Sequence, residues 1–102
     1  MVKIIWTKRA LSDLEEIGNY ISKDSFHYAQ ITLEKIVGAT SFLEANPFIG
    51  RKVPEINETS IRELIVGSYR LIYAINHTSI FILTIYHSAR LLKKGSIKRP
   101  KK

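Results

Sequence analysis

The chain has 102 residues, of which 45% are hydrophobic, which fits one folded domain and excludes a globally disordered protein. It contains no cysteine, which excludes disulfide bonds and thiolate catalysis. Its net charge of +7 is unevenly placed, because residues 64–102 hold eight Lys and Arg residues and no acidic residue. A half of the chain that carries only positive charge attracts polyanions or an acidic protein, although the last dozen residues are equally explained as a solubilising tail.

The N-terminal half predicts a strand and two helices. Val2 to Trp6 is rich in β-formers, and Thr7 is the expected N-cap of a helix that ends near residues 23–24. A second helix begins around Ser25 and stops at Asn46-Pro47, because the residue before proline disfavours the helical conformation. Helical spacing predicts two buried faces, one made of Ala10, Leu14, Ile17 and Ile21 with Leu11 beside them, the other of Ala29, Leu33, Ile36, Val37, Thr40 and Leu43.

The C-terminal half predicts a loop and an antiparallel meander. Residues 46–60 (NPFIGRKVPEINETS) form the loop, and strands follow at residues 61–66, 69–75 and 79–87. Alternation places Arg70 on the face of Ile72 and Ala74. In the last strand it separates Phe81, Leu83, Ile85 and His87 from Ile80, Ile82, Thr84 and Tyr86.

The expected architecture is α+β, in the order β-α-α-β-β-β, with a helical hairpin packed on one face of a small antiparallel sheet. We expect one domain over residues 1–92 and a basic, flexible tail over residues 93–102. The N-terminus does not look like a secretory signal, and residues 79–86 are too few to span a bilayer. We therefore expect a soluble, cytoplasmic protein that needs no membrane.

Several chemistries are unsupported by the sequence. No glycine-rich loop precedes a helix, and His27, His77 and His87 show no ligand spacing with carboxylates, so we expect no cofactor and no metal. What remains is a set of cations on the loop and the strands, which can converge into an anion site because guanidinium groups bind phosphate or carboxylate bidentately. Its members are Arg51, Arg62, Arg70 and Arg90, and Lys93 and Lys94 extend it as a partner-binding surface.

A structural role for the same residues stays open. Arg62 and Arg70 would then pair with Glu63 or with a helix carboxylate and only solubilise one face. His87 suits proton transfer near neutral pH but equally fits a hydrogen-bonded residue at a strand end. Glu55 is the one acidic residue near the arginines placed to act as a general base, and it can instead cap the turn.

Four segments resemble the RelE/ParE toxin superfamily, and its ParE-like branch most closely. They are TKRALSDLEEIGNYI, NPFIGRKVPE, IRELIVGSYRLIYAI and IYHSARLL, which together run from about Ile4 to Leu91. The resemblance implies a toxin neutralised by a cognate antitoxin in a toxin–antitoxin hetero-oligomer. It puts the family's arginines at Arg51, Arg62, Arg70 and Arg90, with His87 in the closing motif.

The resemblance leaves the target of the toxin open. The leading hypothesis is a non-enzymatic inhibitor of DNA gyrase that blocks replication, because the P-x-x-G-R-x-V-P-E loop and the I-R-E-L strand look more like ParE. The alternative is a RelE-like, metal-independent, ribosome-dependent mRNA endoribonuclease. In that case His87, Arg62, Arg70, Arg90 and Glu55 would be catalytic. A third possibility is a degenerate toxin that serves only as an interaction partner.

Overall fold

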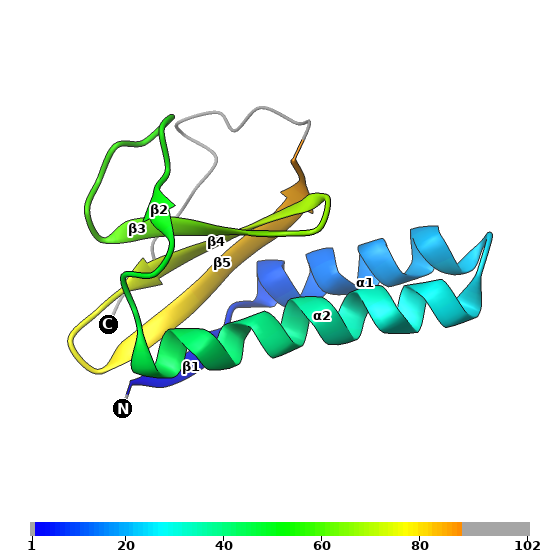
Figure 1. Ribbon diagram of the computed structural model, residues 1–102, viewed down its shortest axis with the longest axis horizontal. Helices are drawn as coiled ribbons and strands as arrows, with labels where there is room; N and C mark the ends of the chain where they lie inside the picture. The colour runs from blue at the N-terminus through cyan, green and yellow to red at the C-terminus, as the bar shows by residue number, and fades with distance from the viewer. Residues whose placement is uncertain (1, 89–102) are drawn as a thin grey trace.

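The structure is a computed structural model that describes residues 2–88. The described chain forms two helices and five strands (Figure 1). In chain order they are β1 (Lys3–Trp6), α1 (Lys8–Ser22), α2 (Phe26–Ala45), β2 (Arg51–Lys52), β3 (Ile61–Val66), β4 (Tyr69–Ile75) and β5 (Ser79–His87). The last three strands begin and end at the predicted residues. The expected tail at residues 93–102 and the end of the expected domain lie outside the described residues.

Both helices begin at the predicted capping residues. The Thr7 hydroxyl oxygen accepts a hydrogen bond from the Ala10 N–H at 3.2 Å, and the Ser25 hydroxyl oxygen accepts one from the Tyr28 N–H at 3.0 Å. Thr7 also donates its hydroxyl hydrogen to the Ile82 carbonyl at 2.7 Å, which fixes the start of α1 against β5.

The helices form the predicted hairpin and cover one face of the sheet (Figure 1). They contribute Ala10, Ile36 and Leu43 to a core with residues of β4 and β5. Val37 was expected in that core, but its side chain is 45% exposed, so this prediction is wrong. None of the described helices is both long and apolar enough to cross a membrane.

The sheet is mixed, with the strand order β1-β5-β4-β3-β2. The meander of β3, β4 and β5 is antiparallel as predicted, whereas β1 lies parallel to β5, with Lys3 opposite Ser79 and Trp6 opposite Ile82. Within the predicted loop, the two residues of β2 pair with β3, which extends the sheet beyond the four expected strands.

A bulge in β5 changes which residues face the helices. The pairing passes from Ile72 opposite Thr84 to Tyr73 opposite Ile82, so Leu83 is an extra residue. Ile85 therefore lies in the core under the helices, although simple alternation placed it with Phe81 and Leu83. The carboxylate of Asp13 on α1 holds the bulge, because it accepts hydrogen bonds from the Thr84 hydroxyl and, at 3.1 Å, from the Ile85 N–H.

The opposite face of the sheet has a core of its own. Val53 and Ile56, from the segment between β2 and β3, pack on this face together with Ile72, Ala74 and Leu83. This segment therefore covers the sheet face that the helices leave free, and the charged side chains described next lie on that face.

Candidate functional site

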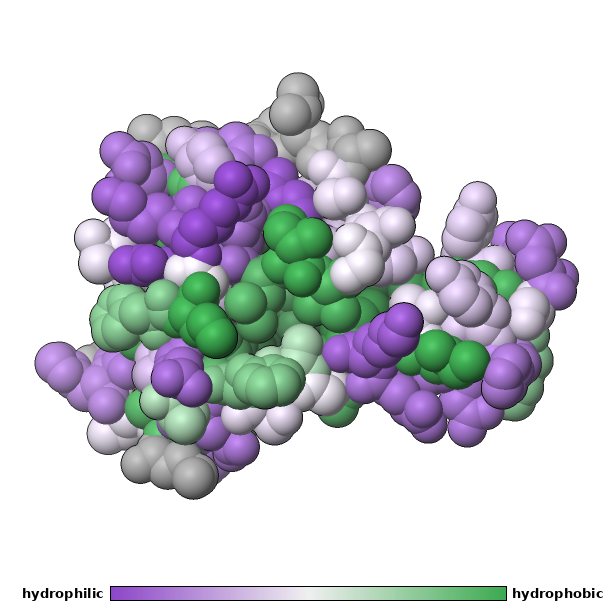
Figure 2. All heavy atoms as spheres, viewed as in Figure 1, coloured by the Kyte–Doolittle hydropathy of each residue, from purple (hydrophilic) through white to green (hydrophobic). Residues whose placement is uncertain are grey.

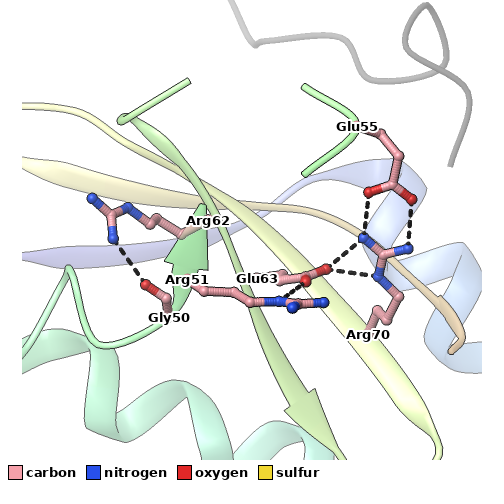
Figure 3. Close-up of polar contacts among 6 residues, drawn as sticks. All are labelled: Gly50, Arg51, Glu55, Arg62, Glu63 and Arg70. Carbon is pink, nitrogen blue, oxygen red and sulfur yellow. Dashed lines mark hydrogen bonds and ion pairs between the residues drawn. The ribbon is translucent and has the colours of Figure 1, made fainter. Parts of the chain in front are cut away.

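A buried ion-pair cluster lies on the sheet face away from the helices (Figure 3). Its centre is Glu63 of β3, whose side chain is fully buried, and Arg70 of β4, which is 6% exposed. The Arg70 Nε–H donates to Glu63 Oε1 at 2.6 Å, and its two Nη groups donate to the Glu55 carboxylate at 2.9 and 3.0 Å. Arg51 of β2 pairs with the other oxygen of Glu63.

The four charges of this cluster cancel, since two guanidinium groups face two carboxylates. The hydrogen bonds that Arg70 donates to Glu55 raise the pKa of Arg70 above its ordinary value, against the opposing effect of burial. The Arg70 guanidinium also lies 5.4 Å from the centre of the Tyr86 ring, in a cation–π contact. Arg70 is therefore surrounded by its own partners, while the Arg51 side chain remains 65% exposed.

Arg62 does not join this cluster. It is adjacent to Glu63 on β3, so its side chain leaves the sheet on the other side (Figure 3). Its guanidinium donates to the carbonyl of Thr59 at 2.9 Å and to that of Gly50 at 3.1 Å, and it lies 5.1 Å from the centre of the Phe48 ring.

Three of the four predicted arginines lie within the described residues, and two of these three come together, at a carboxylate of the protein itself. Arg51 and Arg70 meet at Glu63, while Arg62 contacts the loop. The pairing of Arg70 with Glu63 that the sequence left open is present, and the same pairing for Arg62 is not. Arg90, Lys93 and Lys94 lie outside the described residues.

The loop that carries Arg51 is held by Tyr73. The Tyr73 hydroxyl donates to the Pro47 carbonyl at 2.8 Å and accepts from the Gly50 N–H at 2.9 Å, and burial raises the pKa of Tyr73. A Cβ at Gly50 would lie 2.4 Å from the Glu63 carbonyl oxygen, so only glycine fits this approach. The sequence reasoning gave Tyr73 and Gly50 no such role, although a glycine directly before Arg51 was a visible signal.

His87 lies on the helix side of the sheet, opposite the cluster. It pairs across the ladder with Tyr69, and the two rings meet edge to face at 5.7 Å. Together with Ile85 it lines a hollow of about 470 Å³ beside α1. Tyr86 packs on the other face with Arg70, so the expectation that Tyr86 and His87 lie on opposite faces is confirmed.

The hydroxyl of Tyr86 is the least expected feature of the cluster. It is buried and has no hydrogen-bond partner in the structure of residues 2–88. Burial raises the pKa of Tyr86, and the nearby positive charge of Arg70 lowers it. The sequence placed Tyr86 on the same strand as His87 but could not show that its ring lies against Arg70.

This fold is that of the RelE/ParE class of toxins. A ParDE toxin–antitoxin system of P. aeruginosa superimposes with a TM-score of 0.71 at 22% identity, over 85% of this chain and 96% of that one. The YoeB dimer of Staphylococcus aureus superimposes with a TM-score of 0.61 at 20% identity, over 84% of this chain and 97% of that one.

The sequence comparison defines the family. The family described as the ParE toxin of the type II toxin–antitoxin system, parDE, matches residues 4–92. Toxin RelE2 of Caulobacter vibrioides is 34% identical over 92 residues, which is 89% of this chain and all of that protein. A putative toxin of Sinorhizobium fredii, Y4kP, is 38% identical over 84% of this chain and 88% of that one. The chain belongs to the ParE toxin family and is the toxin of a type II toxin–antitoxin system.

Proposed function

We propose that the protein inhibits DNA gyrase through protein–protein contact and performs no chemistry of its own. The observation that carries this proposal is the closed pairing of Arg70 with Glu55 and Glu63. A nuclease would need Arg70 to bind the charged phosphate and Glu55 to accept a proton. In this structure both Glu55 oxygens accept hydrogen bonds from Arg70, so each group is engaged by the other.

The surface charge supports binding rather than catalysis. The Arg51 side chain is 65% exposed at its position on β2, and the adjacent Lys52 is exposed as well. The C-terminal half of the chain adds further cations, including Arg90, Lys93 and Lys94. Such a surface attracts an acidic or DNA-bound face of a target, and the attraction weakens with salt.

The partner that controls the toxin is a cognate antitoxin. Family membership supports this pairing, as does the likeness of the fold to toxins of the ParDE, RelBE2 and YoeB–YefM toxin–antitoxin systems. We propose that the antitoxin forms a hetero-oligomer with this chain and covers part of the surface used on gyrase.

A ribosome-dependent endoribonuclease is the second candidate, and the Tyr86 hydroxyl is the observation that favours it. This buried hydroxyl lies near Arg70, Glu55 and Glu63 and lacks a partner among the described residues, as a group that meets a substrate would. In this case Arg62, Arg90 and His87 would assist at the phosphate and at the departing oxygen. His87, however, lies on the opposite face of the sheet from Arg70.

One side-by-side experiment separates the two functions. Purified protein is added to a gyrase supercoiling assay and, at the same concentration, to a translation reaction whose mRNA is mapped by primer extension. We expect supercoiling to be inhibited and no codon-linked cuts to appear. His87→Ala and Tyr86→Phe serve as matched variants, and both should still inhibit gyrase. Codon-linked cuts that disappear in Tyr86→Phe, with supercoiling untouched, would establish the nuclease instead.

A further inference from the structure

The last residues of β5 have two possible registers against β4. In the first part of this ladder Tyr73 lies opposite Ile82. A ladder that continued regularly from that pair would place Ile85 opposite Arg70. Because of the bulge, the register shifts by one residue and Tyr86 lies opposite Arg70 instead. The register therefore decides which residue of β5 contacts Arg70.

The two registers give the face of the sheet that carries Arg70 different side chains. Opposite residues of an antiparallel pair lie on the same face. In the observed register the Arg70 guanidinium lies 5.4 Å from the centre of the Tyr86 ring. The regular register would bring Ile85 to this position and turn Tyr86 toward the helices. His87, which lies on the helix side in the structure, would turn to the face of Arg70.

Tyrosine suits this face better than isoleucine does. The face carries the ion-pair cluster, and the segment between β2 and β3 that covers it is mainly hydrophilic on its outer surface (Figure 2). An aromatic ring attracts the guanidinium of Arg70, whereas an aliphatic side chain only packs against it. The Tyr86 hydroxyl is also buried and has no hydrogen-bond partner among the residues that the structure describes. The bulge therefore places a polar group with unused hydrogen-bonding capacity on this face.

Asp13 of α1 binds β5 directly after the bulge. Its Oδ2 atom accepts hydrogen bonds from the Thr84 hydroxyl and, at 3.1 Å, from the Ile85 N–H. A slip of one residue would move both donors by about 3.3 Å along the strand and reverse the side to which each points. The carboxylate therefore fits the observed register and not the regular one.

Thr7, the N-cap of α1, binds β5 before the bulge. Its hydroxyl donates to the Ile82 carbonyl at 2.7 Å and lies 3.2 Å from the Leu83 carbonyl. Ile82 lies opposite Tyr73 in either register, so its contact with Thr7 does not distinguish the two. Among these contacts of α1, the hydrogen bonds to Asp13 are the ones that depend on the register.

We propose that Asp13 is a positioning residue whose carboxylate selects the register of β5 and so places Tyr86, rather than Ile85, against Arg70. Asp13 acts through the residues of β5 that it binds, from the helix that borders the strand. Any activity that uses the Tyr86 hydroxyl depends on Asp13 as well. The inference goes beyond the proposed function, because the register is a property of the toxin whichever target it binds.

Nuclear Overhauser effects in the full-length toxin test the register directly. In the wild type they should join the Tyr86 ring to the Arg70 side chain. They should also join the rings of Tyr69 and His87, whose centres are 5.7 Å apart. In Asp13→Ala the two registers should interconvert, so the effect between Tyr86 and Arg70 should weaken at least about twofold. A new effect between Tyr86 and Tyr69 should appear, because these residues are opposite in the regular register.

Two results would overturn the proposal. An unchanged effect between Tyr86 and Arg70 in Asp13→Ala would show that the bulge forms without the carboxylate. Loss of that effect with no new effect between Tyr86 and Tyr69 would show that the end of the strand only frays. Asp13 would then stabilise β5 without selecting its register.

Conservative variants separate positioning from folding. Asp13→Asn keeps an acceptor oxygen at the same place and should retain the wild-type effects of Tyr86. Thr84→Val removes one of the two donors in a milder change, and it should weaken the effect between Tyr86 and Arg70 less than Asp13→Ala does. A spectrum of Asp13→Asn that matches Asp13→Ala would contradict selection by hydrogen bonding.

The matched control is Glu16→Ala. Glu16 is an exposed acidic residue of α1 that lines the same hollow as Asp13, so this variant should give the wild-type spectrum. The measurements contain neither gyrase nor ribosomes. A toxin that leaves supercoiling untouched therefore disproves the proposed function alone, and unchanged spectra of Asp13→Ala disprove the role of Asp13 alone.

Discussion

The guanidinium group of Arg70 and the carboxylate of Glu55 meet through two hydrogen bonds of 2.9 and 3.0 Å. Arg70 belongs to a central strand, and Glu55 belongs to the segment that covers the sheet. The contact therefore holds that segment against the sheet. It also neutralises part of the buried positive charge of Arg70. In this arrangement an arginine of the family contributes to the fold itself, and its substitution should be judged first by stability.

Arg70→Ala should destabilise the protein by about 3 kcal/mol, because it leaves Glu63 buried with only Arg51 as a partner. Lys52→Ala, at an exposed neighbouring position, should stay within about 0.5 kcal/mol of the wild type. Urea unfolding followed by circular dichroism measures both. Equal stability of the two variants would show that the cluster contributes little to folding.

Gly50→Ala should lower the free energy of unfolding by about 1–3 kcal/mol, because its Cβ would lie 2.4 Å from the Glu63 carbonyl oxygen and 2.7 Å from the Tyr73 hydroxyl. Gly38→Ala on α2 meets no atom within 4 Å and should instead raise it by about 0.5–1 kcal/mol. Thermal unfolding of both variants checks the opposite signs. An unchanged free energy of unfolding in Gly50→Ala would mean that the loop shifts easily to make room for the Cβ.

Asp13→Ala should lower the free energy of unfolding by about 2 kcal/mol, because the Thr84 hydroxyl and the Ile85 N–H lose their shared acceptor. Glu15→Ala, an exposed acid on the same helix, is the matched control and should change stability by less than about 0.5 kcal/mol. Denaturant unfolding measures the change in the free energy of unfolding. The rate of hydrogen exchange at the Ile85 amide shows whether the bulge keeps its structure. Slow exchange of that amide in Asp13→Ala would mean that the bulge does not need the carboxylate.

Stability should fall in alkaline solution. Burial raises the pKa of Tyr73 above its ordinary value of 10.0, so the folded state keeps the phenol proton to higher pH than the unfolded state does. This contribution is complete below pH 10.0 and is lost as the pH rises through the folded-state pKa. Urea unfolding from about pH 8 to about pH 11 measures the loss. Tyr73→Phe should be less stable at the lower pH and show a smaller decline than the wild type.

Local patterns predicted the elements well. Thr7 and Ser25 cap their helices, Pro47 follows the end of α2, and Gly67 has the positive φ of 60° that the two-residue turn between β3 and β4 requires. These features depend on residues that are close together in the sequence, so local sequence patterns predict them. The parallel pairing of β1 with β5 and the two-residue β2 depend on contacts between distant segments, and periodicity does not report those.

The site was harder to predict for the same reason. The position of Ile85 depends on a bulge that Asp13 holds from 72 residues away, so a strict period of two gave the wrong face. Glu55 was singled out as a base, and its bidentate contact with Arg70 follows only from how the loop folds back. The separation of Arg62 from Arg70 was available from the sequence, because the two-residue turn puts Ile65 opposite Arg70, and Arg62 is three residues from Ile65 and so faces the other way.

The pairing of the first strand with the last has a consequence for synthesis. Within residues 2–88 the strand partner of residues 3–6 is residues 79–82, so a growing chain cannot complete this sheet until almost all of the described sequence has left the ribosome. Contacts of such long range also slow folding. A truncated product that stops before β5 lacks the partner strand of β1 and is therefore expected not to complete the sheet.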